Sequence, residues 1–72
     1  VAHFAIIGRL HGDDEDTCFV YECDDEPQAR QNFIDDMLAL DDITPEEAAE
    51  GFEHTNVYIT HTLASESRIE VL

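Results

Sequence analysis

The sequence contains no lysine and no tryptophan, and only three arginines, Arg9, Arg30 and Arg68, stand against 18 aspartates and glutamates. The formal net charge is therefore −15. Proteins that bind nucleic acid directly neutralise its phosphates with clustered Lys or Arg, and these three arginines are too few and too scattered. The same deficit argues against attachment to an anionic membrane surface. We expect no direct binding to nucleic acid or to a membrane.

Long apolar runs and paired cysteines are also missing. The longest apolar run, Phe4 to Ile7, is far shorter than a spanning helix or the apolar core of a signal peptide, so we expect a soluble, unexported chain. The two cysteines, Cys18 and Cys23, are five positions apart. On a strand they would lie on opposite faces, and we expect unpaired thiols in a reducing compartment.

Sequence motifs of catalysis and metal binding are absent. The sequence has no nucleophile elbow, phosphate-binding glycine loop, HExxH, CxxC or DxDxDG calcium loop. The carboxylates of Asp13–Asp16 lack the alternate-residue spacing that directs ligands onto Ca²⁺, so we expect a solvated loop. Among the histidines and cysteines, only Cys18 and Cys23 have the spacing of a zinc-ligand pair, and their side chains are expected to diverge. A short chain has little room for a cleft holding two carboxylates in different environments, and we predict a non-enzyme without cofactor or metal.

The residues that are present are typical of one folded domain spanning 1–72. Apolar residues make up 43% of the chain, which is too rich for a disordered protein. His3–Leu10 and Thr17–Cys23 are rich in β-branched and aromatic residues, and the polar tract His11–Asp16 separates them. This pattern predicts a β-hairpin. Gly8, inside the first run, indicates a bulge or a close backbone approach.

A helix is predicted after the hairpin. An acidic tract and Pro27 are favourable in the first turn of a helix. Ala29, Phe33, Met37 and Leu40 then recur at spacings of four, four and three, which is the periodicity of an apolar helix face. We therefore expect these side chains to pack against the sheet.

A second, short helix is predicted by Thr44-Pro45-Glu46-Glu47. Thr44 is expected to cap a backbone N–H and Glu47 to reach back in a capping box, with Ile43 and Ala48 as an apolar staple. Gly51 predicts an early end for this helix.

Two more strands complete the predicted fold. Asn56–Leu63 forms the third, and one of its faces is expected to carry Val57, Ile59, His61 and Leu63. His61 is then expected to be a hydrogen-bonded histidine of the core. Arg68–Leu72 is expected to be a short closing strand. The sequence thus predicts an α+β fold of order ββααββ, with a mostly antiparallel four-stranded sheet and one longer and one short helix on one face.

The carboxylates are strongly clustered, since residues 13–53 hold 16 of the 18. On the second predicted helix, Glu46, Glu50 and Glu53 fall at i, i+4 and i+7, and this spacing is expected to stack their carboxylates about 5–6 Å apart along one side, close to the step between phosphates. Such like-charge pairs destabilise a helix, so stability alone would not select them. The predicted partner-binding residues are Asp13, Asp14, Glu15, Asp16, Asp24, Asp25, Glu26, Asp35, Asp36, Asp41, Asp42, Glu46, Glu47, Glu50 and Glu53.

The total charge is comparable with that of DNA. A compact domain of this length has a radius of gyration of about 11 Å and a diameter of roughly 30 Å. Duplex DNA carries about 18 negative charges over that length, against −15 here. The sequence therefore permits an imitation of a polynucleotide, provided that the carboxylates follow a ridge.

A small, lysine-free, acidic α+β chain with these acidic doublets resembles the phage-encoded anti-CRISPR proteins, in particular the DNA-mimicking inhibitors of type I surveillance complexes. The resemblance covers size and charge over the whole chain and involves no shared motif. It implies a non-enzymatic inhibitor in the cytoplasm of a bacterial host, bound in the Lys/Arg-lined groove where a Cascade subunit holds target DNA. Carboxylate pairing with Arg and Lys would supply affinity, and electrostatic steering would speed association.

Two alternatives have different consequences. An acidic domain of a halophile would owe its charge to solvent adaptation and would need strong salt to fold. A generic acidic interaction module would bind through an apolar anchor, for which Tyr21, Phe52 and Tyr58 are candidates. In each case self-repulsion favours a monomer.

Overall fold

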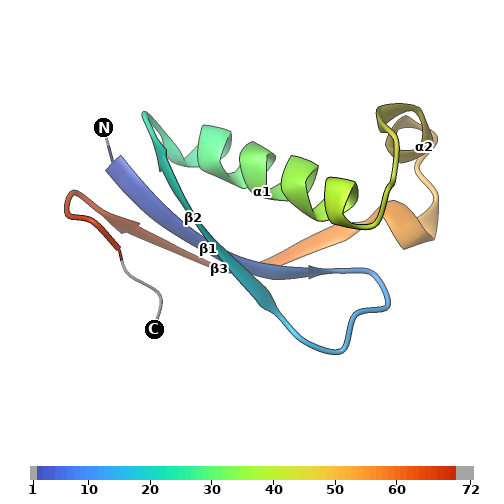
Figure 1. Cartoon of the computed structure of the whole chain (residues 1–72), viewed down its shortest axis with the longest axis horizontal. Helices are drawn as coiled ribbons and strands as arrows, with labels where there is room; N and C mark the ends of the chain where they lie inside the picture. The colour runs from blue at the N-terminus through green and yellow to red at the C-terminus, as the bar shows by residue number, and fades with distance from the viewer. Residues whose placement is uncertain (1, 70–72) are drawn as a thin grey trace.

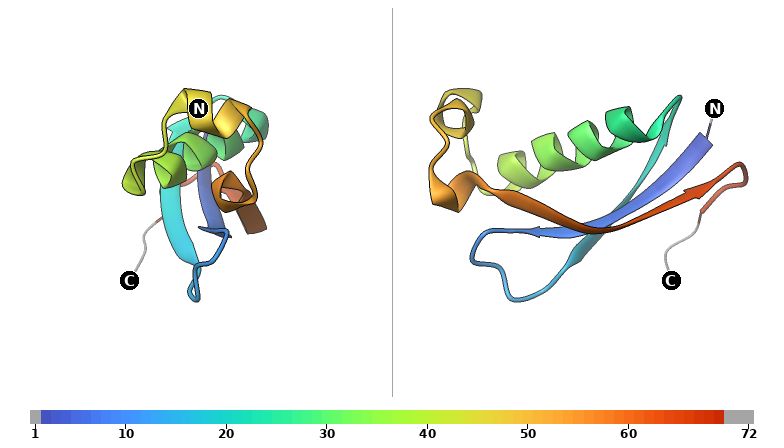
Figure 2. Two further views of the ribbon diagram at one scale, coloured as in Figure 1. Left: turned by 90° about the vertical axis from the view of Figure 1, so that its right-hand side faces the viewer. Right: turned by 180° about the vertical axis from the view of Figure 1, so that it is seen from behind.

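The computed structural model describes residues 2–69 and has an α+β fold (Figure 1). The elements in chain order are β1 (Ala2–Leu10), β2 (Thr17–Cys23), α1 (Glu26–Leu40), α2 (Pro45–Ala49), the 3-10 helix η1 (Glu53–Thr55) and β3 (Val57–Ser65). The strands form one antiparallel sheet in the order β2-β1-β3, so the first strand lies in the middle. Helix α1 covers one face of this sheet, and α2 lies at one end (Figures 1 and 2).

The predicted hairpin is confirmed. Strand β1 pairs with β2 from Ala2 opposite Cys23 to Gly8 opposite Thr17. Because successive side chains alternate between faces, Cys23 lies on the α1 side of the sheet and Cys18 on the other. Both thiols are free, so the prediction of unpaired cysteines is also confirmed.

Helix α1 begins as its sequence predicts. The carboxylate of Asp25 accepts a hydrogen bond of 2.9 Å from the Gln28 N–H, and proline occupies the first turn. This cap satisfies one of the N–H groups that have no partner within the helix. Leu40 departs from the predicted apolar face, because it is 65% exposed. The chain reverses directly after it and packs Ile43, instead of Leu40, against the core.

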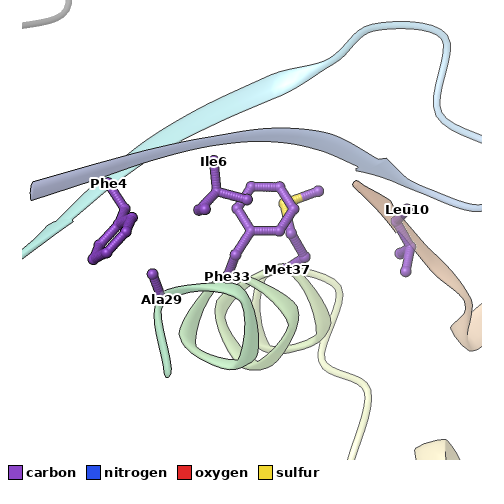
Figure 3. Packing of buried hydrophobic residues seen from close by; sticks show 6 residues of the cluster. All are labelled: Phe4, Ile6, Leu10, Ala29, Phe33 and Met37. Carbon is purple, nitrogen blue, oxygen red and sulfur yellow. The ribbon is translucent and has the colours of Figure 1, made fainter. Parts of the chain in front are cut away.

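The core lies between α1 and the sheet, where Ala29, Phe33 and Met37 meet β1 (Figure 3). Phe33 and Ile6 are completely buried. The Phe33 ring also lies beside Phe19 of β2, with ring centroids 5.9 Å apart. One aromatic side chain of α1 thus joins the helix to two strands.

Gly8 lies at a close backbone approach and at a β-bulge, the two features that a glycine within a strand indicates. A Cβ atom at Gly8 would lie 2.2 Å from the carbonyl oxygen of Tyr58, so only glycine permits this approach of β3. The register of β1 with β3 also shifts here, from Ile7 opposite His61 to Gly8 opposite Ile59. Thr60 is the extra residue of this β-bulge.

The bulge makes the prediction for the later part of β3 wrong. An extra residue shifts the alternation of side chains by one position. Val57 and Ile59 therefore pack against the core, whereas His61 and Leu63 turn to the opposite face. His61 is exposed, not a core histidine, and its Nδ1 lies 3.2 Å from the hydroxyl of Thr60.

The face of the sheet away from α1 is called here the open face, and no described helix covers it (Figure 2). Ala5 lies at its centre, opposite Val20 on one side and Leu63 on the other. Ala5 is buried, whereas Leu63 is 58% exposed and Tyr58 46% exposed. Apolar side chains thus lie at the centre of the open face. The only acidic residue of the three strands is Glu22 of β2, which lies on this face with a carboxylate oxygen 3.8 Å from the Nε2 of His3.

The predicted fourth strand is not confirmed. Of Arg68–Leu72, residues 68 and 69 do not form a strand, and residues 70–72 lie outside the described residues. The sheet has three strands within residues 2–69, and β3 continues to Ser65, two residues beyond its predicted end. Among the helices described in that range, none has both the length and the apolar character needed to cross a membrane.

Candidate acidic binding surface

All fifteen predicted partner-binding carboxylates are exposed. They lie on the hairpin loop, on α1 and around α2 and η1, and none lies on β1 or β3. Asp25 is the N-cap residue of α1, and Glu26, Asp35 and Asp36 lie within this helix. The negative charge is therefore concentrated on the helical side and at the hairpin loop, while the open face has little of it.

Two acidic segments far apart in sequence lie at the same end of the molecule. The hairpin loop and α2 both extend beyond one end of the sheet (Figure 1). The N–H of His11 donates to the carbonyl of Asn56 at 2.8 Å, and its Nε2 lies 3.6 Å from a carboxylate oxygen of Glu53. The acidic end, as we call this region, comprises Asp13, Asp14, Glu15, Asp16, Asp41, Asp42, Glu46, Glu47, Glu50 and Glu53.

The remaining predicted residues are not part of the acidic end. Asp24–Glu26 precede or begin α1 at the opposite end of the molecule (Figure 1). Asp35 and Asp36 lie along the helix between the two ends. The structure therefore separates the fifteen carboxylates into one dense group of ten and two smaller groups.

The predicted row along the second helix is wrong. The capping of α2 by Thr44 is confirmed, since its hydroxyl oxygen accepts a 3.2 Å hydrogen bond from the Glu47 N–H. The helix ends at Ala49, however, and Gly51 has a φ of +76°, which turns the chain away. Glu53 consequently lies in η1, beyond this turn. Glu46, Glu50 and Glu53 do not share one helix side.

Several of the acidic residues have local structural partners. Asp16 pairs with the Arg9 guanidinium at 2.9 Å, and Asp13 accepts a 3.3 Å hydrogen bond from the Leu10 N–H. No ion pair within residues 2–69 involves Asp14, Glu46 or Glu50. These last carboxylates are accordingly open to an external cation.

Asp36 on α1 holds the phenol of Tyr21 on β2. The Tyr21 hydroxyl donates a hydrogen bond of 2.6 Å to the Asp36 carboxylate. Burial raises the pKa of Tyr21 well above its ordinary value, and the hydrogen bond and the negative charge of Asp36 raise it further. Tyr21 therefore joins helix and sheet as a neutral phenol, and this half-buried side chain is already engaged within the domain.

The end of α1 carries two carboxylates that stability does not explain. Asp42 has a φ of +56°, and its N–H donates to the Ala39 carbonyl, while the Ile43 N–H donates to that of Leu38. This is a Schellman motif, in which glycine is usual at the left-handed position. Asp41 and Asp42 also lie at the negative end of the helix dipole, where carboxylates are unfavourable.

We expect Asp42→Gly to raise the free energy of unfolding by about 0.5–1 kcal/mol, because glycine adopts a positive φ without the steric cost of a side chain. Urea denaturation measures the difference. Asp41→Gly is the matched control, since it removes the same charge at a residue with an ordinary φ of −102°. A stability gain no larger than that of the control would show that Asp42 bears no backbone strain.

The dimensions change the comparison with DNA. The molecule extends 37 × 24 × 17 Å, with a radius of gyration of 12.5 Å, so it is longer than the expected globule. A duplex carries about 22 charges over 37 Å and a single strand about 11. The net charge of −15 lies between the two. The average charge density is that of a polynucleotide, but the carboxylates concentrate at one end.

The acidic end is suited to ion pairing. Residues 31–67 contain eight carboxylates up to Glu53 and no Lys or Arg, so this charge has no internal counter-ion from that segment. Exposed carboxylates accept hydrogen bonds from Arg and Lys side chains. Within residues 2–69, no group of three His, Cys, Asp or Glu side chains is placed to hold a metal ion.

One feature of this end could not be predicted from the acidic doublets. The Nδ1 of His11 lies 3.3 Å from the Tyr58 hydroxyl, and its ring is tilted against the Tyr58 ring. His11 thereby connects the hairpin loop to η1 and β3.

Comparison with protein-family models, curated proteins and solved structures finds no match to this chain.

Proposed function

We propose that this protein is a non-enzymatic decoy of nucleic acid, which binds the Lys/Arg-lined groove of a nucleic-acid-binding protein through its acidic end. The observation that carries the proposal is the concentration of ten exposed carboxylates at the acidic end. Two of them, Asp41 and Asp42, lie at the C-terminal end of α1, where the helix dipole disfavours negative charge. A solvent adaptation would distribute acidic residues over every exposed face, whereas here the three strands contribute only one, Glu22.

The mechanism is electrostatic. Carboxylates that replace phosphates on a basic groove form charge-assisted hydrogen bonds and displace the anions bound there. The field of the acidic end also raises the rate of encounter with a positively charged groove. Following the resemblance to anti-CRISPR proteins, we propose a type I CRISPR surveillance complex as the partner, with a Cascade subunit as the contact.

Competition with DNA tests the proposal. We expect the protein to displace fluorescent target duplex from a purified type I surveillance complex, and its affinity to fall at least about a hundredfold between roughly 50 and 500 mM salt. Fluorescence anisotropy measures both effects. Binding that is indifferent to salt would overturn the mimicry, and absence of competition would overturn the CRISPR assignment.

Circular dichroism in low salt separates the decoy from a halophilic domain. The decoy is expected to keep its secondary structure in ordinary buffer. Loss of structure below molar salt would instead assign the charge to solvent adaptation.

A further inference from the structure

An apolar groove lies between the two helices, next to the acidic end. Its volume is about 610 Å³, and its apolar lining includes Ile34 and Leu38 of α1, Ile43 of the connection and Pro45 and Ala48 of α2. This volume is within the range of about 300–1,000 Å³ typical of ligand sites.

The local sequence explains why the groove stays open. The buried face of α1 consists of Ala29, Phe33 and Met37, whereas Ile34 and Leu38 form a second stripe one position further round the helix. The Schellman motif reverses the chain and places Ile43 against this stripe. Helix α2 then contributes Pro45 and the small side chains Ala48 and Ala49, and it has no buried residue.

The charge around the groove defines what can enter it. Asp35 lies in its lining, and acidic residues flank the lining residues in sequence, at Asp41–Asp42 and at Glu46–Glu47. These carboxylates, called here the rim, have no Lys or Arg within residues 31–67, and Arg30, which precedes the lining residue Gln31, donates a 3.1 Å hydrogen bond to Thr62 of β3. An occupant with an apolar side chain and adjacent positive charges matches both the lining and the rim.

We propose that this groove holds an aliphatic side chain from a short basic amphipathic helix of the partner, with Arg or Lys residues of that helix paired to the carboxylates of the rim. Helices commonly bind apolar grooves in this way, and fully enclosed anchors dominate the energy of many interfaces. The inference rests on the proposed function, because it assumes a basic partner. It adds a determinant of specificity, since charge alone would not distinguish one basic groove from another.

Two synthetic peptides of equal charge test the inference. The first is a basic helix of about 16 residues with Leu at i, i+3, i+4 and i+7 among Lys and Arg, and in the second Ser replaces every Leu. We expect the Leu peptide to bind at least about tenfold more tightly, because its side chains leave water on entering the groove. Fluorescence anisotropy of labelled peptides gives the affinities.

Two variants that fill the groove test whether the difference in affinity between the peptides arises there. Ala49→Trp and Ala39→Trp each place a large ring at an exposed lining position, one on each helix. Each is expected to reduce the affinity of the Leu peptide to that of the Ser peptide. Ala64→Trp, at an exposed position of β3 away from the groove, is the matched control and is expected to change neither. Circular dichroism checks the fold of each variant.

The outcomes separate this inference from the proposed function. Equal, salt-dependent affinity for both peptides would overturn the groove and leave the acidic decoy standing. Tight binding of the Leu peptide without salt dependence would support the groove and contradict the electrostatic decoy. Absence of binding by the Leu peptide, or unchanged binding to both blocked variants, would overturn the groove.

Discussion

Replacing Phe33 with alanine is expected to destabilise the domain strongly. The side chain is completely buried and packs against both β1 and β2. Truncation of a buried phenylalanine costs about 3–5 kcal/mol, because apolar contacts are lost and a cavity remains. The whole free energy of unfolding of a domain of this length is about 4–11 kcal/mol, so this loss consumes much or all of it.

Urea denaturation followed by circular dichroism measures the effect of this substitution. Leu40→Ala is the matched control, because it truncates an apolar side chain of the same helix that is 65% exposed. Substitution there is expected to change the free energy of unfolding by no more than about 0.5 kcal/mol. Equal stability of the two variants would mean that Phe33 does not centre the core.

Reversing Glu46 and Glu50 to lysine is expected to weaken binding to the surveillance complex by about a hundredfold, because each lysine replaces an attraction with a repulsion inside a basic groove. The pair leaves out Glu47, whose N–H takes part in the cap of α2. Asp14→Lys with Glu15→Lys is expected to act similarly on the hairpin loop. That pair avoids Asp13 and Asp16, which have local partners.

A control of equal charge distinguishes position from net charge. Glu22→Lys with Glu66→Lys reverses two exposed carboxylates outside the predicted binding set. The affinity is expected to fall by no more than about tenfold, through the weaker long-range field. Competition for labelled target DNA at fixed salt gives all three affinities. If the control pair weakens binding as much as the two test pairs, the acidic end is not the contact.

The local elements could be predicted because their signals are local. The alternation in His3–Leu10 and Thr17–Cys23, the caps at Asp25 and Thr44 and the periodicity around Phe33 each lie within one segment. The bulge at Thr60 could not be placed in this way. It depends on the approach of β3 to Gly8, about 50 residues away in the chain, and its consequence for His61 was therefore predicted wrongly.

The exposure of the carboxylates could be predicted from the sequence, but their grouping in space could not. Their exposure follows from their chemistry, since unpaired charges are rarely buried. Their grouping does not, because it requires knowledge that the hairpin loop and α2 lie at one end of the sheet. The early end of α2 was predicted from Gly51, and the structure shows that it removes the single-helix row of Glu46, Glu50 and Glu53. The groove between the helices left no sequence signal beyond the small residues of α2.

The central position of β1 has a consequence for the order of folding. Strand β1 is synthesised before β3 but must hydrogen-bond to it, and the β1–β3 ladder joins residues more than 45 positions apart. Contacts of such long sequence separation form slowly, because a long loop must close before they contribute. A nascent chain that lacks β3 would expose one edge of β1, and the high negative charge of the segment already synthesised would then keep such chains from aggregating.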